Sequence, residues 1–477
     1  MANIKKNFFY SSILTTANYI FPFITYPYVS RVLGVEKIGI CNFVDSIINY
    51  FILFSMLGIS ILGIREIAKC KKNTEELNRT FSSIFFLNSI STSLTLIILI
   101  IATITLPQLY NHKELMFIGA LKLIFNYLLV EWLYKGLEDF KFITTRTIIV
   151  KCIYVISVFS FIHEAKDYKL YYFILSMMVI VNAIINIIYS RKVIHLTLKG
   201  LNIKQYVKPF IMLGMYTLLT SMYTSFNVAY LGFTGGEIEV GYYTTATKLY
   251  SILLSIFTAF TGVMLPRMSS LVSEKRFDEF RNLSNKSINM LLGISIPLIL
   301  FSTIFSQQII QIISGKGYEG AIIPMQIVMP LMLIIGYEQI IVIQTLMPLR
   351  KDKIILINSI IGASIGIIFN VLLVSEYKSI GSAITWVCSE VSVLIIAQYF
   401  VQKYIQIKFP IYAITKNIIY NIPLGVCLYF MSKTLSTPIN IIGAGILFIL
   451  YSIILQVFIL KNENFTNIFK KLLKIKN

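Results

Sequence analysis

The sequence predicts an all-α integral membrane protein with about fourteen transmembrane helices. The first reason is composition: the 477 residues are 56% hydrophobic and only 13% charged, with a mean hydropathy of +0.76. Soluble domains carry about 25% charged residues. The second reason is that apolar runs of about 20 residues, the length that crosses a bilayer, recur along the whole chain. Together these observations exclude soluble globular, disordered and coiled-coil proteins.

Fourteen segments meet the requirements for a membrane span. In chain order they are 7–30, 39–64, 80–109, 116–134, 143–162, 170–190, 209–234, 241–266, 287–313, 321–349, 354–374, 380–401, 411–431 and 438–460. The first, sixth and fourteenth contain no charged residue, whereas the fourth, fifth and thirteenth do. Segment 7–30 follows two lysines, as a signal peptide would, but it is long for one and lacks an A-x-A-like cleavage site. We therefore expect it to be retained as the first helix.

The distribution of basic residues orients these helices. An even number of spans places both termini on one side, and the segments on that side hold 31 Lys and Arg against eight on the other. Cytoplasmic loops of membrane proteins collect basic residues, so we expect both termini to be cytoplasmic. The same bias explains the net charge of +20 without a nucleic-acid partner. Lys122, Lys151 and Lys248 lie inside predicted spans.

A weak internal repeat relates the second span to the eighth at an offset of 202 residues. The offset superposes residues 37–39 on 239–241, Gly34 on Gly236, Tyr28 on Tyr230 and Arg65 on Arg267. Six spans separate the copies, so the two halves would share their orientation, as in transporters with parallel repeats. We expect an N-lobe at 1–200, a C-lobe at 201–408, and two additional helices with a basic tail at 409–477. The alternative is that two hydrophobic hairpins match by chance.

Polar side chains recur at helical spacing in the first two spans of each half, which places each set on one helix face. These sets are Asn7, Ser11, Thr15, Asn18 and Thr25; Asn42, Asp45 and Asn49; Thr217, Ser221 and Thr224; and Thr244, Lys248, Ser251 and Ser255. Serine and threonine alone can simply hold helices together. Charged residues inside the membrane cost about 2.5–3.5 kcal/mol each on insertion scales and mark functional sites.

Two interpretations of these charges remain open. Asp45 and Lys248 lie about two turns from the outer ends of their spans, with Lys122 at a similar depth and Arg31 at the outer end of the first span. Asp45 and Lys248 can form a buried structural ion pair, or the cations can face a hydrated cavity that receives an anion, which we favour.

Other intramembrane charges allow two roles each. Glu338 and Glu390 can join a hydrogen-bonded contact between helices or, like Asp45, couple transport to a proton or cation. Arg146 and Lys151 enter the fifth span from the inside, and we expect both to extend to the membrane surface. Arg65 and Arg267 begin inner loops, where each can contact either lipid phosphate or an anionic substrate.

Three segments resemble the bacterial polysaccharide flippases of the O-antigen and capsule type. They are Pro22–Gly34 (PFITYPYVSRVLG) followed by Ile38-Gly39; Leu57–Ile59 with Gly63–Lys69 (GIREIAK); and Met264–Ser269 (MLPRMS) at the end of the eighth span. Length, fourteen spans and a six-plus-six repeat are similar to the wider multidrug/oligosaccharidyl-lipid/polysaccharide exporter superfamily. The motif resemblance is concentrated in residues 7–70 and 240–270.

This resemblance implies a function. The substrate would be an undecaprenyl-diphosphate-linked oligosaccharide, moved from the inner to the outer leaflet of the bacterial cytoplasmic membrane by alternating access. Residues at the cavity would bind its diphosphate or sugar: Arg31, Asp45, Asn49, Lys122, Lys248 and Arg65. No catalytic residue, metal or cofactor is expected, and coupling to H+ or Na+ would involve Asp45, Glu338 or Glu390. Membrane lipids, a polysaccharide polymerase and chain-length machinery are the expected partners.

Three alternatives belong to other functional classes. A multidrug antiporter of the same superfamily would share the fold but favour an acidic cavity for cationic substrates. A membrane polymerase or glycosyltransferase would need catalytic groups on a sizeable outer loop, and the predicted outer loops are short. A channel would need a selectivity filter, which nothing in the sequence resembles. The absence of a G-x-x-x-x-G-K-[ST] pattern argues against ATP hydrolysis by this chain.

Overall fold

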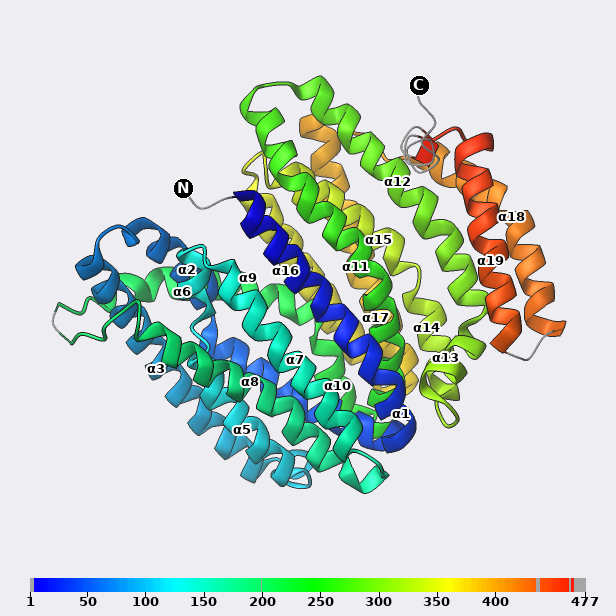
Figure 1. The fold of residues 1–477 in the computed structure, drawn as a ribbon. Coiled ribbons are helices and arrows are strands. Elements are labelled where there is room, and N and C mark those ends of the chain that lie inside the picture. Colours follow the sequence, from blue (N-terminus) through cyan, green and yellow to red (C-terminus); the bar gives the residue numbers. More distant parts are fainter. Residues whose placement is uncertain (1–3, 199, 435–437, 463–464, 467–477) are drawn as a thin grey trace. The chain divides into compact units, whose positions relative to one another are not determined.

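The computed structural model describes residues 4–198, 200–434, 438–462 and 465–466, and these residues form helices joined by short turns (Figure 1). The chain divides into two compact units, Met1–Thr244 and Thr245–Asn477. Among the described residues, eleven helical segments are long and apolar enough to cross a membrane, and two of these segments contain a sharp break that separates two spans. The predicted multi-pass helical fold is confirmed.

The first unit contains the helices of the first seven predicted spans and the start of the eighth. Its elements are α1 (Ile4–Met56), α2 (Ile59–Cys70), α3 (Thr74–Thr105), α4 (Pro107–Tyr110), α5 (Lys113–Tyr127), α6 (Glu131–Gly136), α7 (Phe140–Phe161), α8 (Tyr168–Ser190), α9 (Lys204–Thr224), α10 (Phe226–Thr234) and the start of α11 (Glu237–Ser273). Helix α1 packs against α3, α5 and α7, and α8 packs against α5 and α7.

The second unit contains the rest of α11 and the remaining spans. Its elements are α12 (Phe277–Ile304), α13 (Ser306–Ser314), α14 (Ile322–Val328), α15 (Leu331–Gln339), α16 (Asp352–Phe369), α17 (Ser375–Ile405), α18 (Ile411–Thr434) and α19 (Pro438–Ile454), with π-helical turns at Ile340–Leu346, Asn370–Val374 and Leu455–Ile459. Helix α17 packs against α14, α15 and α16, while α12 packs against α15, α18 and α19.

Several predicted spans are broken helices. The first two spans join as α1, and the chain turns between them at Gly34, whose φ of 77° is open to glycine at little cost. The predicted helix 39–64 is wrong as one segment, since α1 ends at Met56 and the backbone breaks at Leu57 (φ 31°) before α2. The fourth span breaks in the same way at Val130 (φ 37°), between α5 and α6.

The two short helices that follow these breaks pack on each other through glycines. A Cβ on Gly63 of α2 would lie 2.5 Å from the Trp132 ring of α6, and a Cβ on Gly136 of α6 would lie 2.7 Å from Ile67 of α2. Trp132 and Ile67 belong to the buried core of the first unit, which extends to α3. The breaks in the second and fourth spans therefore position α2 and α6 as one packed pair.

Candidate functional site

A polar cavity of about 340 Å³ lies within the first unit. Its lining comes from the second span, from the α9–α10 break and from the start of α11: Asn42, Asp45, Ser46, Asn49, Tyr50, Leu53, Ser221, Ser225, Val228 and Thr244. The lining therefore includes the predicted polar face of the second span and part of the predicted face of the seventh. Helical spacing explains this, because residues three and four apart lie on one side of a helix.

Asp45, Asn49 and Lys122 form a closed polar triad at this cavity. The Lys122 ammonium donates to Asp45 Oδ1 at 2.6 Å and to Asn49 Oδ1 at 3.0 Å, and Asn49 Nδ2 donates to Asp45 Oδ2 at 2.9 Å. The Tyr172 hydroxyl donates a third hydrogen bond to Asp45, at 3.3 Å. Two spans contribute the charges, since Asp45 and Asn49 lie on α1 and Lys122 lies on α5.

The two charges of the triad differ in exposure. The Lys122 side chain is 9% exposed and that of Asp45 is 25% exposed, so the carboxylate lines the cavity and the ammonium lies behind it. A buried lysine in a membrane protein needs a partner of opposite charge, and Asp45 supplies it. Neither interpretation of the sequence predicts this pairing, since one pairs Asp45 with Lys248 and the other places the cations in a hydrated cavity.

A second cavity of about 450 Å³ continues from the first, since Asn49 and Leu53 line both. The α2–α6 pair forms its far side, where Glu131 and Lys135 contribute charge. Glu131 accepts from Lys135 and from Arg146 at 3.1 Å each. Together the two cavities, called the polar path below, extend from Asp45 along the second span to the Glu131 cluster, with polar groups at both ends and apolar residues between them.

Arg146 overturns one prediction from the sequence. Its side chain is only 3% exposed because it pairs with Glu131, so it does not extend to the membrane surface. Lys151 is half-buried, and its ammonium donates to Asn18 Oδ1 on α1 at 2.8 Å. The predicted polar face of the first span therefore has at least one hydrogen-bonding partner on the fifth.

The other predicted binding residues lie elsewhere. Arg31 is exposed on α1, one turn before the Gly34 break. Arg65 lies on α2 with its side chain 51% exposed, and its Nε donates to Glu66 at 2.9 Å. Lys248 is half-buried on the part of α11 that belongs to the second unit. Their roles in substrate binding remain predictions.

The start of α11 crosses α1, and the residues that meet at the crossing are equivalent in the internal repeat, 202 residues apart in the sequence. Asn42 Nδ2 donates to Thr244 Oγ1 at 2.9 Å, so equivalent residues of the repeat contact each other. A Cβ on Gly39 would lie 1.7 Å from the Glu237 carbonyl oxygen, and a Cβ on its equivalent, Gly241, would lie 2.4 Å from the Val35 carbonyl oxygen. Only glycine permits backbones to approach this closely.

The breaks before these two segments are also equivalent. Gly34 and Gly236 adopt φ values of 77° and 85°, and each precedes the helical segment that carries a crossing glycine. The repeat predicted from a few sequence matches thus corresponds to matching backbone turns and matching contacts.

In the second unit, two intramembrane acids are in contact. The Glu390 carboxylate on α17 accepts from Trp386 Nε1, also on α17, at 2.9 Å, and Glu338, on α15, is its close neighbour. The roles considered for the two acids, a contact between helices or a site for ion coupling, remain predictions.

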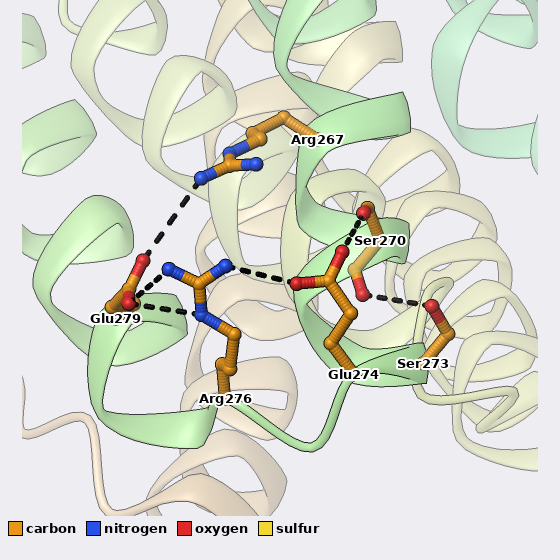
Figure 2. Close-up of polar contacts among 6 residues, drawn as sticks. All are labelled: Arg267, Ser270, Ser273, Glu274, Arg276 and Glu279. Atoms are coloured by element: carbon orange, nitrogen blue, oxygen red, sulfur yellow. Dashed lines mark hydrogen bonds and ion pairs between the residues drawn. The ribbon is translucent and has the colours of Figure 1, made fainter.

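Arg267, the repeat equivalent of Arg65, also lies near a carboxylate (Figure 2). Its guanidinium is 3.9 Å from Glu279 of α12, and Arg276 in the α11–α12 turn bridges Glu279 and Glu274. Hydrogen bonds from Ser270 and Arg276 hold the pKa of Glu274 below its ordinary value. Hydrogen bonds to Glu279 and Glu274 raise the pKa of Arg276. This charge network ties the end of α11 to the start of α12.

Sequence reasoning missed Tyr172, Glu131 and the pairing of Asp45 with Lys122. Asp45 and Lys122 are 77 residues apart in the sequence. Both Lys122 and Lys248 are predicted at a depth similar to that of Asp45, so depth alone does not show which lysine pairs with it. Glu131 follows the unexpected break at Val130, so it was read as part of a continuous span. One signal was available: Glu131, Lys135 and Arg146 are three charges near one predicted membrane boundary.

Two curated relatives match over almost their full lengths, and a third matches over less than half of its length. A protein of Escherichia coli K12 named "Putative O-antigen transporter" is 25% identical over 407 residues, which is 84% of this chain and 97% of the relative. A protein of the same name from Shigella dysenteriae is 25% identical over 410 residues, 82% and 98% of the two chains. A "Probable low-salt glycan biosynthesis flippase Agl15" of Haloferax volcanii is 21% identical over 41% of this chain and 42% of its own length.

Solved structures share the fold. The lipid II flippase MurJ in an inward closed conformation aligns with a TM-score of 0.76 at 17% identity, covering 97% of this chain and 99% of that chain. An inward-facing multidrug resistance MATE family transporter of the MOP superfamily aligns with a TM-score of 0.63 at 13% identity, covering 83% and 98%. These similarities show that the chain shares the fold of these two structures.

The family itself is shown by a sequence model that matches residues 4–272, more than half of the chain, and that is described as "Polysaccharide biosynthesis protein". The matched region contains the first unit with both of its cavities and the predicted flippase-like motifs. With transporters and flippases among its relatives, this multi-pass membrane chain belongs to the polysaccharide biosynthesis protein family.

Proposed function

We propose that this protein is a flippase for undecaprenyl-diphosphate-linked oligosaccharide repeat units, which it moves from the inner to the outer leaflet of the bacterial cytoplasmic membrane. The observation that carries the proposal is the continuous polar path of two cavities in the first unit, in a chain of the polysaccharide biosynthesis family. Each cavity has the size of a small-ligand site. The names of the curated relatives agree with such a substrate.

The chemistry of the path suits a lipid-linked sugar. Asn42, Ser46 and Asn49 offer amide and hydroxyl groups to sugar hydroxyls. Lys122 supplies a cation that is held by Asp45 until a competing anion arrives. A diphosphate carries such an anionic charge, while the polyprenyl chain stays in lipid. We further propose that Arg31, Lys248 and Arg65 serve the diphosphate at other stages of transport.

Alternating access is the proposed mechanism. At Gly39 and Gly241, α1 packs closely against the start of α11. Close-packed contacts of this kind switch between separate arrangements rather than deform gradually, so the two helices can part at this contact. The cavity that Asn42 and Thr244 line lies directly beside this crossing. Opening of the contact between α1 and the start of α11 would expose the cavity to one face of the membrane. Closing of this contact would expose the cavity to the opposite face.

The proposal can be tested with purified protein in liposomes. A fluorescent undecaprenyl-diphosphate oligosaccharide is placed in both leaflets, and the fraction accessible to a membrane-impermeant quencher is followed over time. If the protein flips this lipid, the fluorescent lipid of the inner leaflet becomes accessible to the quencher over time. Lys122→Met protein, reconstituted to the same density, should leave that fraction protected. Liposomes that show no movement of the lipid but take up a cationic dye would replace this proposal by the multidrug antiporter alternative.

A further inference from the structure

The second unit holds a polar cavity of about 440 Å³ that the proposed transport path does not use. Helices α12 and α18 and the chain just after the last π-helical turn form its walls. Three lysines line it, one from each wall: Lys286, Lys416 and Lys461. Within the part of the chain that the structure describes, no aspartate or glutamate lines the cavity. Three ammonium groups around one cavity attract an anion to it.

Amide groups complete this cavity. Asn282, Asn285 and Asn289 recur at spacings of three and four on α12, so they present one helix face to it. Their side-chain N–H groups are hydrogen-bond donors of the kind that bind phosphate and sugar oxygens without adding charge. The lining thus combines point charges for an anion with neutral donors for its oxygens.

The floor of the cavity is fixed by buried polar groups. Gln456 is 1% exposed, and its Nε2 donates to Asn417 Oδ1 on α18 at 3.0 Å. Gly293 on α12 makes room for this side chain, because a Cβ there would lie 2.7 Å from Gln456 Oε1. Asn462 Nδ2 donates to the Asn289 carbonyl oxygen at 3.3 Å. These bonds connect the three walls, so the lysines are held around a preformed cavity.

The position of the cavity indicates a lipid ligand. Lys286 lies in the third turn of α12, just before the predicted span 287–313, and Lys416 lies in the second turn of α18. Lys461 follows the last π-helical turn by two residues. All three therefore lie near the ends of membrane spans, where lipid headgroups are found. Tyr412, which also lines the cavity, is 78% exposed, as is typical of aromatic residues at a membrane interface. Lysines near the membrane surface bind anionic lipid headgroups.

We propose that this cavity binds the phosphate-bearing headgroup of an anionic lipid. The phosphate lies among the three lysines, and the asparagines of α12 donate to its remaining oxygens or to the hydroxyl groups attached to it. Two lipids carry this chemistry, a phospholipid such as phosphatidylglycerol and a polyprenyl diphosphate. The site is separate from the polar path of the first unit, and the proposal does not rest on the proposed transport activity.

The test compares lipid binding by the full-length protein and two triple variants. Lys286→Gln/Lys416→Gln/Lys461→Gln removes the charges of the cavity, and Lys275→Gln/Lys353→Gln/Lys403→Gln removes three exposed lysines outside it. Binding of phosphatidylglycerol, undecaprenyl diphosphate, phosphatidylcholine and inorganic diphosphate is titrated by native mass spectrometry. We expect the cavity variant to bind at least one anionic lipid more than about tenfold more weakly, and the control variant to match the wild type.

The outcomes separate the possible ligands. Loss of phosphatidylglycerol binding identifies a structural phospholipid, and loss of undecaprenyl diphosphate binding alone identifies a docking place for the polyprenyl lipid. Equal weakening in both triple variants, or binding of phosphatidylcholine as tight as that of the anionic lipids, would overturn the proposal. So would tight binding of inorganic diphosphate with no lipid preference. Asn285→Asp, which adds a negative charge to the cavity wall, gives a second variant in case the triple variant fails to fold.

Discussion

At the scale of single residues, the Asp45–Lys122 pair dominates the chemistry of the first unit. Its ammonium is nearly buried, its carboxylate lines the cavity, and Asn49 connects the two. An anion that enters the cavity would compete with Asp45 for Lys122. The triad therefore contains a cation that an anionic ligand can bind.

The first prediction concerns the stability of this pair. Removing one partner of a buried ion pair leaves an uncompensated charge and costs about 3–5 kcal/mol. Lys122→Met and Asp45→Asn should therefore each lower the unfolding temperature in detergent, and the Asp45→Asn/Lys122→Met double variant should recover much of the loss. Lys37→Met, which breaks a partly exposed pair with Glu36, should cost at most about 1 kcal/mol. A double variant as unstable as the sum of the single variants would show that the two residues are not coupled.

The second prediction concerns Lys248, the intramembrane cation of the eighth span. We expect Lys248→Ala and Arg31→Ala to abolish translocation while leaving the protein in the membrane, since the diphosphate loses a cation in each case. Lys248→Arg should retain part of the activity, because it keeps the charge but changes its geometry. The flipping assay with equal amounts of reconstituted protein measures this. Normal transport by Lys248→Ala would remove Lys248 from the binding site.

At the scale of elements, the crossing of α1 and the start of α11 is the tightest backbone contact described above. Gly39→Ala would place a methyl group against the Glu237 carbonyl, and overpacking of this kind costs about 1–3 kcal/mol. We expect lower thermal stability and impaired transport. Gly262→Ala on α11 is the matched control, because nothing lies within 4 Å of its added Cβ and alanine favours the helix. If both variants behave alike, close approach at Gly39 is not required.

The turn between α11 and α12 gives a pH-dependent prediction. Because the pKa of Glu274 is lowered in the folded protein, its ionised form stabilises the turn at neutral pH. That stabilisation is present above the ordinary glutamate pKa of about 4.3 and disappears as the pH falls through the lowered folded value. Glu274→Gln should therefore be less stable than the wild type near neutral pH, and the difference should vanish in acid. Thermal unfolding followed across this range tests the sign.

Hydropathy could place the membrane helices but not their internal breaks. Each predicted span corresponds to helix in the described residues, because length and apolar composition are set by the bilayer. The breaks at Leu57 and Val130 depend on tertiary packing of α2 against α6, which no local sequence signal encodes. Helical spacing was sufficient to predict that Asp45 and Asn49 share one helix face. It could not predict that Lys122 of α5 pairs with Asp45, because spacing within one helix does not show which helix lies opposite.

At the scale of the whole molecule, the open question is what drives transport. Asp45 in the first unit and the neighbouring Glu338 and Glu390 in the second are the intramembrane carboxyl groups that the sequence suggests for coupling. They differ in their partners. Asp45 pairs with the Lys122 ammonium, whereas Glu390 accepts from the neutral Trp386 indole and lies beside a second carboxyl group. Because two neighbouring carboxylates repel each other when both are ionised, we propose the glutamate pair as the coupling site.

This difference leads to the last prediction. If the glutamate pair couples transport to protons, an imposed pH gradient should change the flipping rate of the wild type, and Glu338→Gln and Glu390→Gln should each remove that response while lipid still equilibrates across the membrane. Glutamine keeps a hydrogen-bond donor in place, so the helix contact between α15 and α17 should survive and thermal stability should change little. Glu319→Gln, at the exposed start of the α14 segment, is the control. A response to a sodium gradient alone, or a pH response that persists in both variants, would exclude the pair and return the role to Asp45, whose protonation would then release Lys122 toward the substrate.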